Sequence, residues 1–309
     1  MKTLNETINE VMNNGKSLAN KRENLKKIGC LSQTDITIII NNYKKNHPEA
    51  LVPSFKFAYT YGVEIETYGM SRDDMYAAAN RNALNIQYQG YNHTDSHTIF
   101  KFVTDASISG ANGIECVTPV LKGEKSGFDS LKNCCKCLNE AGAKVNKSTG
   151  LHVHIGCEGM TDAWYVNVFK NYKMLEMLID TFMAESRRAQ NGYYCRSLSG
   201  VDLSYCTTIR DVEVACARDH NATGARYHKV NPCSWGRHQT IEFRQHQGTT
   251  DYSKISHWVK FCAKLVGWSK SNVLTEPILT IENIPFLTAA EKAFFKSRKI
   301  ALNGIAEAA

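Results

Sequence analysis

Apolar residues recur at helical spacing near the start of the chain, as at Leu4, Ile8, Val11 and Met12. That spacing predicts a helix, and a second helix is predicted from Ser17 to Ile28, where a glycine follows. Ser32 and Asp35 have the spacing of a capping box, so a third helix is expected to begin there and to end at His47-Pro48. Residues 1–54 are therefore predicted to form a helical appendage.

From Phe55 the pattern changes to alternation of apolar and polar residues, which predicts a strand through Thr67. Further strands are predicted at 86–91, 98–104, 113–118, 151–156, 226–231 and 239–245. Helices are predicted at 71–84, 128–142, 160–188, 207–218, 253–265 and 288–305. This order indicates a mixed domain of strands and helices over 55–275, followed by a helical extension over 276–309.

Composition and charge agree with a globular protein. The chain has 309 residues, of which 43% are hydrophobic and 22% charged. The formal charge is +7, and residues 1–56 contribute +4 of it, with nine Lys and Arg against five Asp and Glu. A helix-turn-helix that binds nucleic acid would explain the basic residues of this part, but a solvated helical appendage is the favoured interpretation. These basic residues include Lys21, Arg22, Lys26, Lys27, Lys44 and Lys45.

The cysteines and the apolar runs bear on location. Eleven cysteines are scattered from Cys30 to Cys262 without a regular framework, which favours reduced thiols in a cytoplasmic protein. The polar start of the chain is unlike a signal peptide, and its longest apolar run is too short to span a bilayer. We therefore expect no membrane partner.

Glu64 and Glu66 are the first residues that suggest chemistry. They stand two apart in a predicted strand, so both carboxylates leave one face, about 6–7 Å apart. Such a pair repels unless a cation lies between the two carboxylates. Taken alone, the pair is better explained as two ordinary glutamates on a solvated face.

Three more predicted strands place ionisable side chains on one face. His152 and His154 alternate with apolar residues in one strand, Glu242 and Arg244 do so in another, and Glu115 lies in a third. Four such strands are hard to explain as independent accidents, so together they predict a site.

The mixture of side chains bears on the ligand. Several carboxylates with one or two imidazoles and no thiolate suit Mg²⁺ or Mn²⁺ better than Zn²⁺. The chain has neither a P-loop motif nor a strand-linked GxGxxG, so any ATP would be held by metal and sheet. The CxxC formed by Cys134 and Cys137 lies in a predicted amphipathic helix and is interpreted as structural.

An ordered series of motifs resembles the amidoligase family of the carboxylate-amine ligase superfamily, which includes glutamine synthetase and glutamate-cysteine ligase. The series is Gly62-Val-Glu-Ile-Glu66, Thr104-Asp-Ala-Ser-Ile108, Gly113-Ile-Glu-Cys-Val-Thr-Pro119, Gly150-Leu-His-Val-His-Ile155, Ser186-Arg-Arg188 with Tyr194-Cys195, Arg226-Tyr227 with Val230-Asn231, and Thr240-Ile-Glu-Phe-Arg244 with Gly248-Thr249 and Trp258. The resemblance covers about residues 59–268. One departure is Ala106, where the family often has glycine.

The resemblance implies an α+β fold like the glutamine synthetase catalytic core: a curved antiparallel sheet, helices packed on its convex side, and a polar concave face for ATP and two or more divalent ions, Mg²⁺ or Mn²⁺. By similarity, Glu66 and Glu115 would bind one ion. Glu64, Glu242 and either His152 or His154 would bind the other, with His152 favoured because it comes first after the glycine turn.

The remaining roles also follow from the resemblance. Arg244 would face the transferring phosphoryl group, assisted by Arg226 or Lys229 as further ATP contacts. Asp105, Ser107 and Asn231 would contact the substrate, with Asp105 also expected to act in catalysis. The implied activity joins a small-molecule or peptide carboxylate to an amine through an acyl phosphate. A zinc-dependent hydrolase and a non-catalytic nucleic-acid-binding protein are the alternatives.

Overall fold

The chain divides into two compact units, Met1–Phe55 and Lys56–Ala309. The structure is a computed structural model that describes residues 2–13, 18–46, 57–90, 98–188, 193–220 and 224–303. Residues 276–303 belong to the same unit as the sheet.

The described part of the first unit consists of helices α1 (Leu4–Asn13), α2 (Leu18–Lys26) and α3 (Gln33–Asn46). The capping box predicted at the start of α3 is present. Asp35 donates its amide to the Ser32 hydroxyl at 3.1 Å, and its carboxylate accepts the Ser32 amide at 2.9 Å. The helices enclose a small core of their own, made of Met12, Leu25, Ile36 and Ile40. The expected stop at His47-Pro48 lies outside the described residues.

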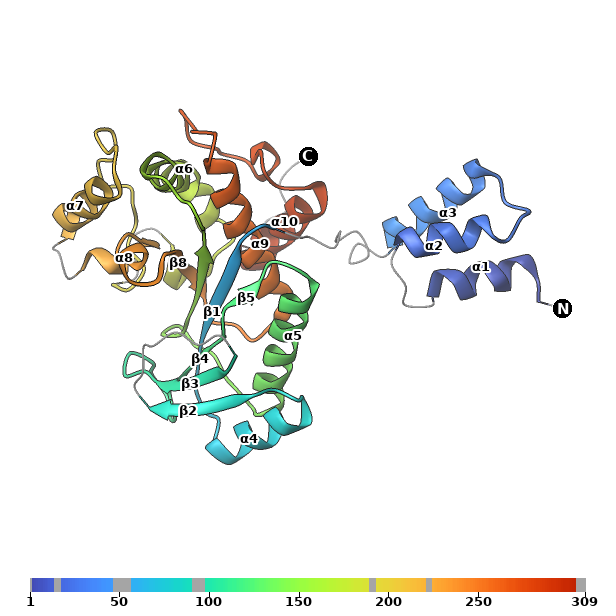
Figure 1. Ribbon diagram of the computed structural model, residues 1–309, viewed down its shortest axis with the longest axis horizontal. Coiled ribbons are helices and arrows are strands. Elements are labelled where there is room, and N and C mark those ends of the chain that lie inside the picture. Colours follow the sequence, from blue (N-terminus) through green and yellow to red (C-terminus); the bar gives the residue numbers. More distant parts are fainter. Residues whose placement is uncertain are drawn as a thin grey trace. The chain divides into compact units, whose positions relative to one another are not determined.

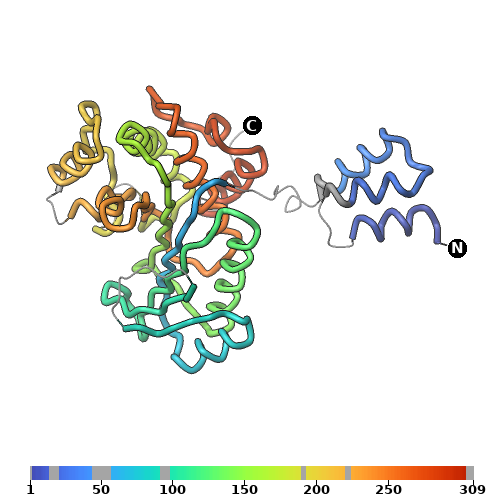
Figure 2. The backbone as a smooth tube through the Cα atoms, in the orientation of Figure 1, coloured from blue at the N-terminus to red at the C-terminus, as the bar shows by residue number. Residues whose placement is uncertain are grey.

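The second unit is built on one eight-stranded sheet with the order β2-β3-β4-β1-β6-β8-β7, and β5 pairs with β1. Its strands are β1 (Thr60–Thr67), β2 (Ile86–Gly90), β3 (Phe100–Thr104), β4 (Ile114–Val117), β5 (Leu121–Lys122), β6 (Gly150–Gly156), β7 (Val230–Asn231) and β8 (Thr240–Gln247). Figure 2 shows β1, coloured blue, running between the later strands β4 and β6. Alternation buries Tyr61, Val63 and Ile65 of β1 and turns its glutamates to the opposite face.

Helices cover the apolar face of the sheet. The largest are α5 (Lys125–Glu140), α6 (Asp162–Asp180) and α9 (Tyr252–Ser269), and Figure 1 shows α5 and α9 next to each other beside β1. Tyr172 of α6 packs on Phe243 of β8 with ring centroids 5.8 Å apart. Trp164 of α6 donates its indole N–H to the carbonyl of Val266 in α9 at 2.7 Å. This layer leaves the polar face of the central strands available for a site.

The prediction of a wholly antiparallel sheet is wrong at one edge. β2 pairs in parallel with β3, whereas the other strand pairs are antiparallel. The expected turn between β2 and β3 covers residues 91–97, which lie outside the described residues. A tight hairpin joins only antiparallel neighbours, so the alternation pattern found these strands but could not give their direction.

Several element boundaries also differ from the prediction. The helix expected at 160–188 ends at Asp180, and a short 3-10 helix follows at Glu185–Arg187. The apolar spacing runs past the end of α6 because Phe182 is buried against Phe295, with ring centroids 4.8 Å apart. The strand expected at 226–231 is reduced to β7, which follows a 3-10 helix at Ala225–Tyr227.

The other helices frame the ends of the sheet. α4 (Arg72–Arg81) is capped at its N-terminus by Ser71, whose hydroxyl accepts the Asp74 amide. α7 is Ile209–His220, and α8 is a short helix at Ser234–His238 that the sequence pattern did not predict. A 3-10 helix at Ile281–Asn283 precedes α10 (Ala289–Asn303), whose Phe295 packs on Phe261 of α9. No described helix combines the length and the apolar character needed to cross a bilayer.

Candidate metal and ligand site

Strand register brings the predicted side chains together on the polar face. Glu64 of β1 lies opposite His152 of β6, and Glu66 lies opposite Glu115 of β4. His154 lies opposite Glu242 of β8. Residues directly opposite in antiparallel strands share a face, so all six side chains converge. We refer to Glu64, Glu66, Glu115, His152, His154 and Glu242 as the carboxylate–histidine cluster.

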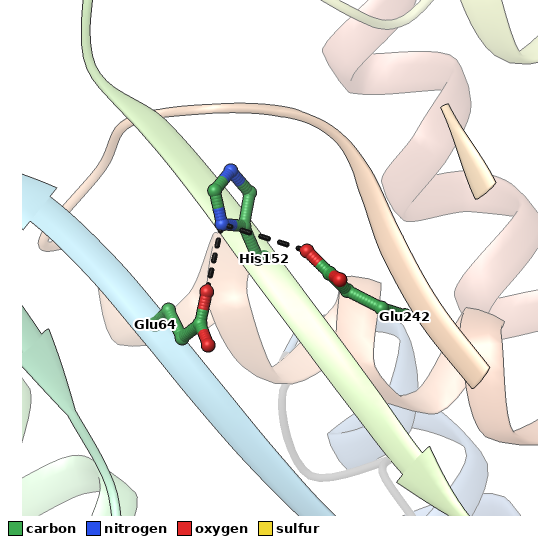
Figure 3. A group of neighbouring side chains, drawn as sticks. All are labelled: Glu64, His152 and Glu242. Carbon is green, nitrogen blue, oxygen red and sulfur yellow. Dashed lines mark hydrogen bonds and ion pairs between the residues drawn. The ribbon is translucent and has the colours of Figure 1, made fainter. Parts of the chain in front are cut away.

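Glu64, His152 and Glu242 form one group that could hold a metal ion. Nδ1 of His152 is hydrogen-bonded to Oε2 of Glu64 at 2.9 Å and lies 3.8 Å from Oε1 of Glu242. Figure 3 shows both carboxylates directed at the imidazole from the strands on either side of β6. Neighbouring strands thus supply one ligand each.

Glu66, Glu115 and His152 form a second group that could hold an ion. Nε2 of His152 lies 3.5 Å from Oε1 of Glu66, and Nδ1 lies 4.0 Å from Oε1 of Glu115. Glu66 is held in place by the amide of Gly150, which donates to its Oε2 at 2.5 Å. His152 therefore lies between the two groups.

The second histidine is engaged differently. Nδ1 of His154 is paired with the Thr240 hydroxyl at 2.9 Å, while Nε2 lies 3.3 Å from Oε1 of Glu64 and 4.0 Å from Oε2 of Glu242. His154 belongs to neither of the two ligand groups. The geometry thus favours His152 as the imidazole ligand.

Burial of so many carboxylates perturbs their protonation. Burial raises the pKa of Glu115 well above its ordinary value, and the nearby carboxylates of Glu64 and Glu66 raise it further. Burial acts in the same direction on Glu64, but the imidazoles of His154 and His152 outweigh it and hold the pKa of Glu64 well below its ordinary value. In the absence of a cation, Glu115 is therefore the carboxyl that retains a proton most readily.

Arg244 compensates the charge of Glu242. Its guanidinium contacts Oε1 of Glu242, and Asn231 donates its amide to Oε2 at 2.6 Å. Burial alone would raise the pKa of Glu242, but Arg244 and His154 outweigh it and lower that pKa. Glu242 is thus ionised and oriented before any ligand binds.

Two cavities adjoin the cluster, and both are bordered by Glu64, Glu115 and His154. The first, of about 650 Å³, is lined by Arg187, Arg226, Arg237 and Arg244, and we call it the arginine-lined cavity. The second, of about 730 Å³, has Val117, Val120, Met160 and Trp235 in its walls, and we call it the apolar cavity. The cluster therefore borders one cavity with a cationic lining and one with apolar walls.

Comparison with known families gives one match. The model of a family described as "Putative amidoligase enzyme" matches residues 58–266, about two thirds of the chain. The chain belongs to this amidoligase family. No curated protein matches the chain. Every residue of the carboxylate–histidine cluster lies within the matched amidoligase region, as do the linings of both cavities.

The arginine-lined cavity also receives several of the remaining predicted residues. Asp105 and Ser107 line the arginine-lined cavity, where Ser107 donates its amide to Oδ1 of Asp105 at 2.7 Å. Ala106 does not have positive φ, so this turn does not require the glycine common in the family. Arg226 is exposed at the same cavity, with its guanidinium 5.3 Å from the ring centroid of Tyr227.

Lys229 is the predicted residue that the structure places elsewhere. It is fully buried, and its ammonium donates to Glu176 and Asp180 of α6, at 2.7 Å in each case. Lys229 lines neither cavity. Its predicted contact with ATP is therefore withdrawn, because two carboxylates behind the sheet already neutralise its charge.

Two residues of the site were missed as candidates. Arg187 occurs in one of the quoted motifs without an assigned role, yet it lies 6% exposed in the arginine-lined cavity and its Nε has no hydrogen-bond partner. A Cβ on Gly150 would come within 3.0 and 3.1 Å of its terminal nitrogens, so the glycine makes room for the guanidinium. Lys101 of β3 lines the apolar cavity and is 3% exposed. A lysine within an apolar strand run, Phe100 to Val103, was the available signal.

Proposed function

We propose that the protein is an ATP-dependent carboxylate–amine ligase that acts through an acyl phosphate. Membership of the amidoligase family supports formation of an amide bond. The observation that carries the proposal is the pair of ligand groups around His152, with a cavity on each side and Arg244 beside Glu242.

The cluster fits two Mg²⁺ or Mn²⁺ ions. Its two ligand groups together contain four carboxylates, one imidazole and no thiol. Glu64, His152 and Glu242 would hold one ion, and Glu66 and Glu115 would hold the second. When bound, such ions neutralise the charge of phosphate oxygens and of the substrate carboxylate.

The two cavities suit the two anionic reactants. We place the carboxylate substrate in the arginine-lined cavity, where Arg187 has an unused donor and Asp105 and Ser107 form the wall near Glu66. We place ATP in the apolar cavity, whose valines and Trp235 suit a base and whose inner end reaches Glu64. The reactive ends of both molecules would then meet at the cluster.

The reaction follows from that placement. An oxygen of the substrate carboxylate attacks the γ-phosphorus of ATP, the bond to the β-phosphate oxygen breaks, and ADP leaves with the electron pair. The amine nitrogen then attacks the acyl carbon, inorganic phosphate departs, and the nitrogen loses a proton, giving the amide.

The chain's own residues would assist in specific ways. Arg244, with its planar donors, faces the transferring phosphoryl group, and Arg226 at the rim of the cavity attracts anions. Asn231 acts by orienting Glu242, since its amide donates to that carboxylate and its Oδ1 accepts the Cys233 amide at 2.8 Å. Both polar groups of the Asn231 side chain thus have partners within the protein, and we assign it no contact with the substrate.

A coupled assay tests the function. Purified protein with Mg²⁺ and ATP is presented with a panel of amino acids, dicarboxylic acids and acidic peptides, each with and without an amine such as hydroxylamine. We expect ADP release that requires both the acid and the amine, together with a hydroxamate or amide product. Absence of nucleotide turnover across the panel would argue against the ligase, and tightly bound zinc that survives dialysis would argue for a hydrolase instead.

A further inference from the structure

Lys101 is a charged residue whose position in the sheet the proposed function does not yet use. It lies opposite Val117 of β4, and Val117 lies opposite Glu64 of β1. Lys101, Val117 and Glu64 therefore form one row across three strands on the polar face. Val103 and Glu115 form part of the next row along the same strands.

Lys101 and Glu64 stand at the two ends of this row, with a small side chain between them. The Cα atoms of Lys101 and Glu64 are about 10 Å apart, twice the spacing of neighbouring strands. The residue between them is a short valine, and Val117, Lys101 and Glu64 all border the apolar cavity. A chain of phosphates lying over Val117 would have the Glu64 carboxylate at one end and the Lys101 ammonium at the other.

The charged residues that line the apolar cavity also indicate that Lys101 would contact an anion there. Among the described residues that line this cavity, Lys101 is the one lysine or arginine, while Glu64, Glu115 and Glu158 are acidic. The arginine-lined cavity, by contrast, is bordered by Lys147 and four arginines. An anion in the apolar cavity therefore depends on Lys101 for a cationic side chain.

Lys101 is also held more firmly than a surface lysine. It is 3% exposed, and its strand is paired on both sides, with β2 and with β4. Its position was fixed when the sheet formed, so binding an anion loses little side-chain freedom. This differs from an exposed lysine, which loses side-chain freedom when it is ordered by a ligand.

We propose that Lys101 binds the phosphate chain of the nucleotide in the apolar cavity, on the side opposite Glu64. The inference rests on the proposed function, since it needs ATP in that cavity. It replaces Lys229, whose ammonium is bound behind the sheet, as the lysine that contacts the nucleotide. The strongly localised charge of an ammonium suits phosphate oxygens without requiring a planar, bidentate geometry.

The test compares probes with and without phosphates. Binding of Mg-ADP and of adenosine is measured by calorimetry for the wild type and for Lys101→Met, Lys101→Arg and Lys132→Met. Lys132 is an exposed residue of α5 and serves as the matched control. We expect Lys101→Met to weaken Mg-ADP binding by about tenfold to hundredfold, the range for a lost charge-assisted hydrogen bond, while adenosine binding stays within about twofold.

The other variants complete the test. Lys101→Arg keeps the charge and should retain most of the Mg-ADP affinity, and Lys132→Met should bind as the wild type does. Val117→Phe fills the space over which the phosphates would lie and should weaken Mg-ADP binding even if Lys101→Met does not fold. Folding of each variant is checked by circular dichroism and thermal unfolding.

The outcomes distinguish a failure of the proposed role of Lys101 from a failure of the proposed ligase function. If the wild type binds Mg-ADP and a folded Lys101→Met binds it equally well, the role of Lys101 is wrong and the proposed function stands. Equal losses for Mg-ADP and adenosine would also overturn the role, because they would show a general effect on the cavity. If the wild type binds neither Mg-ADP nor Mg-ATP, the proposed function fails and the role of Lys101 fails with it.

Discussion

Individual side chains of the cluster act through charge rather than through packing. Glu64 and Glu242 reach His152 from opposite sides, and both have lowered pKa values despite burial, because imidazoles and Arg244 stabilise their ionised forms. Buried carboxylates that stay ionised are ready ligands for a divalent ion.

Replacing either of these carboxylates should remove activity without unfolding the protein. Glu64→Gln and Glu242→Gln keep the side-chain shape but lose the charge, so turnover should fall at least about a hundredfold, because loss of a residue that merely supports a metal ligand already costs about ten- to hundredfold. Initial rates with saturating Mg-ATP measure this. Glu276→Gln, an exposed position outside both cavities, is the control. Wild-type rates in either cluster variant would remove that residue from the site.

The raised pKa of Glu115 leads to a prediction of how metal binding depends on pH. Its pKa is raised by burial and by Glu64 and Glu66, so the folded protein holds a proton there that the unfolded chain would release. The stability gained from that proton is present at low pH and is lost as pH rises through the raised pKa. A bound cation must displace the proton, so Mg²⁺ affinity should increase as pH rises.

Calorimetry in buffers of different ionisation enthalpy measures this displacement directly. The wild type should release protons on binding Mg²⁺, and Glu115→Gln should release fewer and bind more weakly. An Mg²⁺ affinity that stays constant or falls as pH rises would contradict the proposed ligand role of Glu115.

Elements behind the sheet carry the stability of the site. α10 begins at a capping box in which Glu291 accepts the amide and the hydroxyl of Thr288, each at 2.8 Å. The same carboxylate bonds Lys264 of α9 at 2.6 Å. The Glu291 side chain thus stabilises the first turn of α10 and links this helix to α9 by an ion pair.

Glu291→Gln should therefore destabilise the second unit by about 1–2 kcal/mol, through the weakened ion pair with Lys264, since a glutamine can still accept the Thr288 amide. Burial would raise the pKa of Glu291, but its bonds to Lys264 and Thr288 outweigh this and lower it below 4.5. The contribution is then present above pH 4.5 and is lost as pH falls through the lowered pKa.

Chemical denaturation at neutral and acidic pH checks both the size and the sign. The control is Glu282→Gln, which breaks a pair with Lys296 that is about half exposed and should change stability by less than about 1 kcal/mol. A Glu291→Gln effect that grows as the pH falls below 4.5 would contradict the assignment.

At the scale of the whole molecule, the site belongs to one unit. All cluster residues and both cavities lie within Lys56–Ala309, and the first unit has a core of its own. Independent cores allow one unit to fold without the other.

Deleting residues 1–55 should therefore leave the ligase site intact. The shortened protein should show the thermal stabilisation by Mg-ATP that the full chain shows, since binding to the folded state raises apparent stability by mass action. Salt-dependent binding of DNA that the full chain shows and the shortened protein lacks would assign a nucleic-acid function to the basic helices. Loss of Mg-ATP stabilisation on deletion would show that the first unit contributes to the site.

The sequence by itself determined the local features. Alternation placed Glu64 and Glu66 on one face of β1, the spacing of Ser32 and Asp35 marked the start of α3, and the ordered motifs indicated the amidoligase family. The first two depend on residues near one another along the chain, where the periods of strands and helices limit the possibilities, and each motif of the series is itself a short segment.

Tertiary structure decided what depends on distant residues. The register of β1, β4, β6 and β8 made His152 common to both ligand groups. Packing turned Lys229 toward α6 and brought Lys101 to the apolar cavity. Both lysines lie in strand-like sequence, and composition alone cannot say which face or which partner a long charged side chain reaches. That choice is made when strands from separate parts of the chain pair, because pairing fixes the face of every residue at once.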